Sequence, residues 1–199
     1  HFLLALGTRL INQIIPQYNI MMLVVFSIFI VNTQPLHAEL KDHPYALFEL
    51  EGIGGDSTSA AAINEKGWIV GQVHINGLSW HASLWDNRTL NVHDLGVLEG
   101  YTSGAGDINS AGEISGNVTI KDSSTIRHEM YWEKGQMYDI GTLGGDESSA
   151  KAINDLGQLV GYSELYAGDG LYQAFIWDKK NKMINLGGLD PDMRSRAND

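Results

Sequence analysis

The stretch Ala152-Ile153-Asn154-Asp155-Leu156-Gly157-Gln158-Leu159-Val160-Gly161 decides the fold, because its pattern occurs twice more in the chain. It appears as residues 62–71 and, with Asp in the first place, as residues 107–116. One asparagine and two glycines recur at intervals of 45 residues, as Asn64, Gly67, Gly71, Asn109, Gly112, Gly116, Asn154, Gly157 and Gly161. Self-similarity at a fixed period of this size indicates a tandem-repeat architecture.

A tryptophan recurs with the same pattern, and it defines the length of each copy. Trp85, Trp132 and Trp177 are spaced by 47 and 45 residues, so the copies differ by the length of one loop. The copies span about residues 50–94, 95–139 and 140–185, and a partial fourth spans 186–199. Residues 195–199 match 103–107, after which Ile-Asn follows, so we expect the chain to end inside a repeat.

Each copy contains four short apolar runs separated by turn residues. In the first copy these runs are residues 59–64, 68–75, 80–86 and 90–95. Their lengths and their Ile, Val and Trp content favour strands over helices. In Asn-x-x-Gly, the Asn side chain can bond the backbone ahead and the Gly tolerates a positive φ, which predicts a hairpin turn. The second glycine falls inside a strand, where a backbone or a large ring must approach it closely. We favour a packed tryptophan ring, and the alternative for the tryptophans is a platform for a carbohydrate.

Four strands in about 45 residues correspond to one blade of a β-propeller. The sequence therefore predicts an all-β fold of propeller-like tandem repeats, each a sheet of four short antiparallel strands. The coils of a parallel β-helix are shorter, and a β-sandwich would not require such strict repetition. Propellers close with about 4–8 blades. Three complete copies and the start of a fourth predict an incomplete propeller, whose open edges could support self-association.

Residues 1–38 differ in composition from the rest of the chain. They contain one charged residue, Arg9, and one of the 23 glycines. The apolar run Ile20–Val31 is shorter than the ~20 residues of a membrane span and suits the h-region of a signal peptide, with Ala38 before a cleavage point. We expect residues 1–38 to be a signal peptide or N-terminal hydrophobic segment, with an uncleaved anchor or a buried helix as alternatives. Residues 39–199 form the repeat domain, without a membrane span.

Composition excludes several classes of function. The net charge of −11, from 13 Lys+Arg and 24 Asp+Glu, argues against nucleic-acid binding, which needs a basic face. The absence of cysteine excludes a disulfide framework, a Cys-ligated zinc site and a thiol nucleophile. No Gly-x-Ser-x-Gly sequence is present, and no spacing singles out a Ser-His-carboxylate triad. We therefore assign no catalytic residue.

Three elements together resemble the HAF-type extracellular repeat family of bacteria, over about residues 48–199. They are the sequence 139–145 (Asp-Ile-Gly-Thr-Leu-Gly-Gly), the Ile-Asn-x-x-Gly turn, and a His-Ala-Phe-like element before the tryptophan. That last element appears as residues 81–83, 128–130 and 173–175, and no copy matches it completely. The resemblance implies a bacterial protein that is secreted, periplasmic or on the cell surface, with a propeller-like fold. It supplies no catalytic residues.

Four residues are candidates for ligand binding. His81 and His128 occupy equivalent places, and neutral imidazole is a good metal ligand; the third equivalent is Gln173, and structural hydrogen bonding is the alternative. Asp56 and Asp146 follow Gly-Gly and precede Ser or Thr, and clustered oxygens on a loop can hold Ca²⁺. The alternative for these two is a polar turn. Apart from this Ca²⁺ option, we expect no cofactor.

The function that these features favour is an exported, non-catalytic repeat protein that binds a protein or a glycan. The first alternative is a propeller-type hydrolase or lyase with its site at the channel mouth. Such an enzyme predicts polar residues that break the repeat in one copy, for which Glu99, Tyr101 and the loop 164–172 are candidates. The second alternative is a truncated remnant of a longer repeat protein.

Overall fold

The computed structural model describes residues 23–24, 47–75, 79–98, 102–120, 126–188 and 194–197. The chain divides into two units, residues 1–49 and 50–199. In the first unit, the short strands β1 (Leu23–Val24) and β2 (Leu47–Phe48) pair in parallel. The rest of the predicted signal-peptide segment lies outside the described residues. Over the ranges given above, no helix has the length and apolar character needed to cross a membrane.

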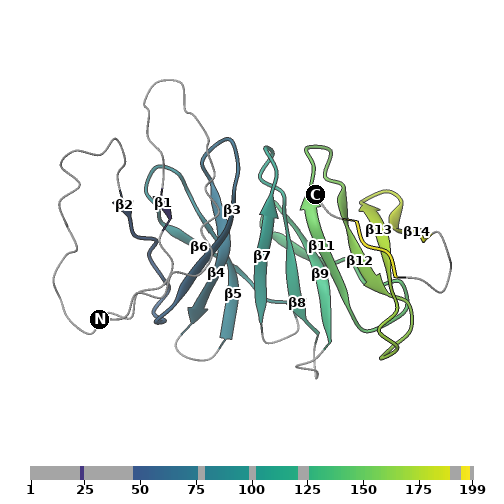
Figure 1. Ribbon diagram of the computed structural model, residues 1–199. Coiled ribbons are helices and arrows are strands. Elements are labelled where there is room, and N and C mark those ends of the chain that lie inside the picture. The colour runs from purple at the N-terminus through teal and green to yellow at the C-terminus, as the bar shows by residue number, and fades with distance from the viewer. Residues whose placement is uncertain are drawn as a thin grey trace. The chain divides into compact units, whose positions relative to one another are not determined.

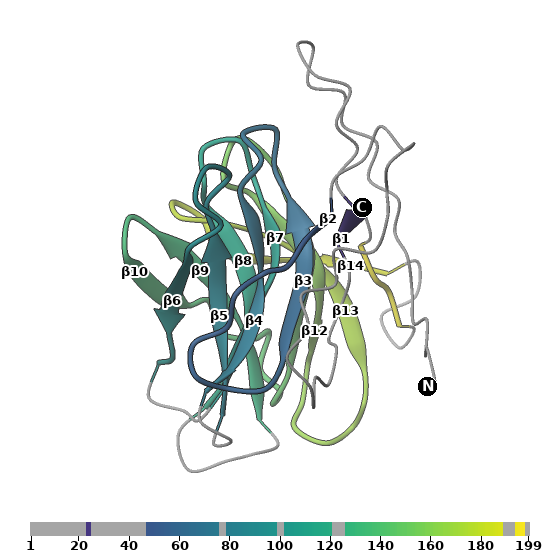
Figure 2. The ribbon, with the colours of Figure 1, turned by 90° about the vertical axis from the view of Figure 1, so that its left-hand side faces the viewer.

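The second unit contains three four-stranded antiparallel sheets, which follow one another in chain order (Figure 1). Viewed from the side, they lie one behind the other (Figure 2). The first sheet consists of β3 (Thr58–Ile63), β4 (Ile69–Ile75), β5 (Ser79–Trp85) and β6 (Val92–Gly96). The second consists of β7 (Ser103–Ile108), β8 (Ile114–Thr119), β9 (Arg127–Glu133) and β10 (Gln136–Asp139). The third consists of β11 (Ser148–Ile153), β12 (Leu159–Glu164), β13 (Tyr172–Asp178) and β14 (Lys182–Gly187).

Within each sheet, strands that are consecutive in the chain pair with each other. The prediction of an all-β fold, with four short antiparallel strands per repeat, is confirmed. In the first sheet, the strands differ from the predicted runs by one or two residues at their ends. The fourth strand is the least well predicted, because β6 extends to Gly96 and therefore into the second assigned repeat.

The Asn-x-x-Gly turn has the predicted geometry in all three copies. The Gly67, Gly112 and Gly157 N–H groups donate to the carbonyl oxygen three residues earlier, at 2.9–3.1 Å. These glycines have φ values of 76°, 93° and 72°, a region that L-residues rarely adopt. The Asn side chain completes the turn: Asn109 Oδ1, for example, accepts the Glu113 N–H at 2.9 Å.

The glycine inside the second strand faces backbone, so of the two expected partners the favoured tryptophan ring is wrong and the close approach of a backbone is confirmed. Gly71, Gly116 and Gly161 lie opposite a β-bulge in the first strand of their sheets. A Cβ at Gly116 would lie 2.1 Å from the Gly104 carbonyl oxygen, and the other two sites are equally tight. The bulge bends the first strand onto its neighbour, and only glycine leaves room for it.

The three repeated tryptophans contribute to the core instead. Trp85 is fully buried, and its Nε1–H donates to the Glu51 carbonyl at 2.9 Å. Trp132 packs against the apolar cluster between the first and second sheets, and Trp177 belongs to the cluster between the second and third. The tryptophans therefore help to hold successive sheets together.

Two apolar clusters lie between the sheets. The first cluster joins buried residues of the first and second sheets, namely Val70, Ala82, Ala105, Ile108, Ile114, Val118 and Met130. The second cluster joins the second and third sheets through Tyr131, Ile153, Leu159, Phe175 and Trp177. Each sheet thus buries a face against the next one, and burial of this kind contributes roughly 25 cal/mol per Å² of apolar surface.

The glycine opposite the bulge can be tested with a matched pair of variants in the second sheet. We expect Gly116→Ala to lower the free energy of unfolding by about 3 kcal/mol, because its Cβ would meet backbone atoms that cannot move aside. Gly106→Ala is the control, since its Cβ would have only ordinary contacts, the nearest at 3.7 Å. Urea unfolding of both variants measures the difference. Equal losses at the two sites would contradict the close-approach explanation.

Candidate functional site

The two candidate histidines each pair with an aspartate on the neighbouring fourth strand. His81 Nδ1 lies 3.1 Å from both Asp94 carboxylate oxygens, and His128 Nδ1 lies 2.8 Å and 3.0 Å from those of Asp139. At the third equivalent place, Asn185 Nδ2 donates to Gln173 Oε1 at 2.7 Å. The histidine–aspartate pair is thus exchanged as a unit for a glutamine–asparagine pair, and the contact across the strands is kept.

These pairs hold a glycine that lies at the end of the fourth strand or, for Gly141, two residues after it. The N–H groups of Gly96, Gly141 and Gly187 donate at 2.7 Å to an oxygen of the Asp or Asn two residues earlier. All three glycines have positive φ values, between 69° and 80°. The side chain therefore caps a left-handed turn that leads the chain out of its sheet.

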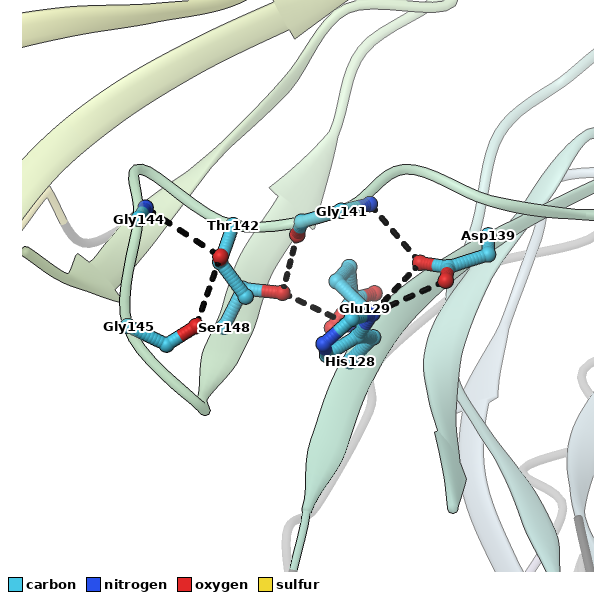
Figure 3. A network of polar contacts seen from close by, with 8 residues as sticks. All are labelled: His128, Glu129, Asp139, Gly141, Thr142, Gly144, Gly145 and Ser148. Carbon is cyan, nitrogen blue, oxygen red and sulfur yellow. Dashed lines mark hydrogen bonds and ion pairs between the residues drawn. The ribbon is translucent and has the colours of Figure 1, made fainter. Parts of the chain in front are cut away.

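A serine in the first strand of the next sheet completes the arrangement. Ser148 Oγ accepts the Glu129 N–H at 2.8 Å and donates to the Gly141 carbonyl at 2.7 Å (Figure 3). The same two bonds recur at the other serines. Ser103 binds Ala82 N–H and Gly96 O, and Ser195 binds Ala174 N–H and Gly187 O, at 2.5–2.9 Å.

We call each such set a junction: the His or Gln, the Asp or Asn, the glycine, the serine of the next sheet, and the backbone N–H that the serine accepts. That N–H belongs to the residue after the His or Gln. The hydrogen bonds and the peptide bond between these two residues therefore form a closed ring of contacts. His128 and Asp139 belong to the second junction (Figure 3). Burial raises the pKa of Asp139, but the hydrogen bonds from His128 and the Gly141 N–H outweigh it and lower the pKa overall.

A second link between sheets runs through the turn asparagines. Asn64 Nδ2 donates to the Asn109 carbonyl at 3.0 Å, and Asn109 Nδ2 donates to the Asn154 carbonyl at 2.9 Å. Asn154 Nδ2 donates to Gln158 Oε1 in its own sheet at 2.9 Å. One side chain thus both shapes its own hairpin and holds the next sheet.

The two candidate aspartates occupy different surroundings. Asp56 Oδ1 lies 2.9 Å from His74 Nδ1, and this hydrogen bond lowers the pKa of Asp56. The Asp146 backbone N–H donates to the buried Glu164 carboxylate at 2.9 Å. Among the residues that the structure describes, no three His, Asp or Glu side chains are grouped so that they could hold a metal ion.

The sequence analysis did not single out the junction serines or the aspartates that pair with the histidines. Ser103 and Ser148 are 45 residues apart, the period of the repeat, and Ser195 follows in the partial copy. Asp94 and Asp139 also keep this period, and Asn185 replaces aspartate where Gln173 replaces histidine. Because both residues of the pair change together in the third copy, the sequence contained a signal that the histidine and the aspartate are in contact.

The second junction contains a buried acid that the other junctions lack. Glu129 stands where the other copies have Ala82 and Ala174, and it is 2% exposed. Its Oε2 accepts the Ala150 N–H at 2.8 Å, whereas Oε1 has no hydrogen-bond partner among the residues that the structure describes. Burial raises the pKa of Glu129 to about 8, although N–H groups of Ala150 and Gly116 favour its ionised form. Glu129 is therefore mostly protonated at neutral pH.

Glu129 should make the stability of the protein depend on pH. In the unfolded chain its pKa is near 4.5, so between about pH 4.5 and about pH 8 only the folded protein retains this proton. Relative to Glu129→Gln, which cannot titrate, the wild-type free energy of unfolding should fall as pH rises through this window, by at most about 1.4 kcal/mol per pH unit. Urea unfolding of both proteins across the window measures the difference, and parallel profiles would contradict it.

The junction serine gives a second test. Ser148→Ala leaves the buried Glu129 N–H and the Gly141 carbonyl without their partner, so we expect the free energy of unfolding to fall by about 2 kcal/mol. Ser149→Ala, at the next residue, is the control. It removes only two long hydrogen bonds, of 3.4 Å and 3.5 Å, and should lower the free energy of unfolding by less than about 0.5 kcal/mol. Thermal unfolding ranks the two variants. A Ser148→Ala protein as stable as Ser149→Ala would show that the junction does not hold the sheets.

A groove of about 430 Å³ lies beside the second junction, between the second and third sheets. It is lined by Tyr131, Tyr138, Asp139, Ile140, Trp177, Lys179 and Lys182. The Tyr131 ring lies 5.0 Å from the Trp177 ring and 6.3 Å from the Tyr138 ring, measured between centroids. Burial and a 2.5 Å hydrogen bond to Glu113 raise the pKa of Tyr131. The groove has the volume of a small-molecule site.

The residues proposed for an enzyme site are described in part. Glu99 and Tyr101 lie outside the described residues. In the loop that joins β12 to β13, Glu164 Oε1 accepts the Gly170 N–H at 3.0 Å, and its Oε2 accepts the Asp146 N–H. Tyr172 donates to Glu147 at 2.8 Å, which raises the pKa of Tyr172 to about 12. These carboxylates therefore hold the loop in place.

Comparison with known proteins finds no matching family model and no matching curated protein. Among solved structures, the crystal structure of TolB from Acinetobacter baumannii is similar, with 14% sequence identity and a TM-score of 0.47. The similarity covers 67% of this chain and 33% of the TolB chain. This chain thus spans about a third of the length of that protein.

Proposed function

We propose that this chain is an exported, non-catalytic scaffold that binds a protein or a glycan, and that its sheets are blades of a propeller-like fold. The observation that carries the proposal is that residues shared by the repeats and residues specific to the second repeat have different roles. Those that the repeats share are hydrogen-bonded to one another in the junctions. Tyr131 and Tyr138, by which the second repeat departs from the others, lie in the lining of the groove. His81 and His128 act in this scheme as structural residues.

The propeller-like arrangement is supported by the identical linkage of successive sheets. Each sheet is joined to the next through a junction and an apolar cluster, as radial repetition of blades requires. Export is supported by the apolar run Ile20–Val31 and by the resemblance to extracellular repeat proteins. The location that follows is outside the cytoplasm: secreted, periplasmic or on the cell surface.

A propeller-type hydrolase or lyase is the alternative, and the placement of the acids argues against it. Glu129 has the raised pKa of a general acid, but it is buried beside β11 and is not part of the groove lining. A general acid must lie within hydrogen-bond reach of the group it protonates. The Tyr131 hydroxyl is already bound to Glu113. The described residues of the groove are therefore better suited to binding than to proton transfer.

The function is tested by probing the full chain against arrays of glycans and of extracellular proteins. We expect at least one ligand whose binding is about tenfold weaker for Tyr138→Ala, because that ring is 44% exposed at the groove. Tyr166→Ala, at an exposed ring on the β12–β13 loop, is the control and should bind normally. Mass spectrometry should recover the ligand intact after long incubation. A cleaved ligand would establish an enzyme, and a wild-type protein that binds nothing on the arrays would refute the scaffold.

A further inference from the structure

The groove between the second and third sheets is lined by residues that the fold itself does not require. Tyr131 occupies the place of Leu84 in the first sheet and Ile176 in the third. Tyr138 likewise occupies the place of His93 and Ile184. Because smaller side chains serve at these places in the sister sheets (Leu84 and His93 in the first, Ile176 and Ile184 in the third), packing alone does not explain two tyrosines at one groove. Their shared position suggests a role in binding.

The rings give the groove an aromatic surface with one accessible part. Tyr131 and Trp177 are buried and tilted by 40° to each other, and they form the floor. Tyr138 is tilted by 36° to Tyr131, and it is 44% exposed, so a ligand can reach its face. A sugar ring carries C–H groups on one face and hydroxyls at its edge, which suits contact with a ring face and with polar side chains around it.

Two lysines stand at the rim of the groove, although the chain as a whole carries −11. Lys179 and Lys182 both line the groove. Lys179 Nζ lies 5.0 Å from the centre of the Tyr131 ring, and it also bonds Glu133. Asp139 is the one acid among the described residues of the lining, and its carboxylate oxygens are occupied by His128 and by the Gly141 N–H. Among the described residues, the Lys182 ammonium is therefore the charged group that the groove offers to a ligand, because Lys179 is already paired with Glu133.

We propose that this groove binds a sugar ring that bears a carboxylate, that is, a uronic acid residue of a glycan. The ring lies against Tyr138, above the floor formed by Tyr131 and Trp177. Its carboxylate is bound by the Lys182 ammonium, with Lys179 beside it. This inference rests on the binding function proposed above and names the ligand class for that same groove.

The test uses the full chain with two uronic acid disaccharides, digalacturonate and dimannuronate, and with their methyl esters. Calorimetric titration should show saturable binding of at least one acid. Its methyl ester should bind about tenfold more weakly, which is the effect of losing one charge-assisted hydrogen bond. Raising NaCl from about 0.05 M to about 0.5 M should weaken the acid several-fold, because salt screens a partly exposed ion pair.

A matched pair of lysine variants locates the contact. Lys182→Gln should weaken binding of the acid about tenfold and leave binding of the ester unchanged. Lys134→Gln removes the same charge at a residue that, like Lys182, has a positive φ, but that is not part of the groove lining. This control should bind as the wild type does. Circular dichroism of both variants checks that they are folded.

The outcomes separate this inference from the general function. If acid and ester bind equally, or if Lys134→Gln weakens binding as much as Lys182→Gln, the assignment of a uronic acid is overturned while the scaffold remains. If neither acid binds, the assignment is likewise overturned, and the array experiment then decides whether the groove takes a neutral glycan or a protein. Binding of the acid that depends on charge and on Lys182 supports the inference.

Discussion

One serine hydroxyl at each junction fixes how a sheet sits against the one before it. It accepts a backbone N–H of the third strand and donates to a glycine carbonyl at or just after the end of the fourth. At the first two junctions its own Cα lies in the first strand of the next sheet. Both partners would otherwise be polar backbone groups without hydrogen bonds inside the protein, which proteins rarely tolerate. The serine therefore sets the spacing and register between sheets, and the apolar clusters, the asparagine links and the groove depend on that spacing.

The parts of this architecture that are local in sequence were predictable, and those that join distant segments were not. Asn64 and Gly67 act within one turn, so their spacing was enough to predict it. The partner of Gly71 was mispredicted, because the β-bulge that brings backbone against it leaves no clear mark in the sequence. The His128–Asp139 contact depends on strand pairing, and only the exchange of both residues in the third copy pointed to it.

Glu129 and the groove tyrosines concentrate the departures from the repeat at one interface. The burial of Glu129 could not be predicted, since a charged residue in a strand is normally expected on the exposed face. A repeat fold tolerates such a residue because the same linkage is made at the other junctions without it. Because the other junctions repeat the same linkage, one interface is free to differ from them. The interface between the second and third sheets has a protonated acid in its interior and an aromatic groove with two lysines at its surface.

The junctions also bear on how the chain acquires its structure. Each serine lies about twenty residues after the backbone N–H that it accepts, with separations of 21, 19 and 21 residues. A sheet therefore becomes complete as soon as the next short strand is available, and these contacts need no closure between distant parts of the chain. Contacts of such short sequence separation form quickly. A polypeptide that emerges in order from a ribosome or a translocation pore can consequently fold its sheets one after another. Each sheet is stabilised once the strand that follows it has emerged.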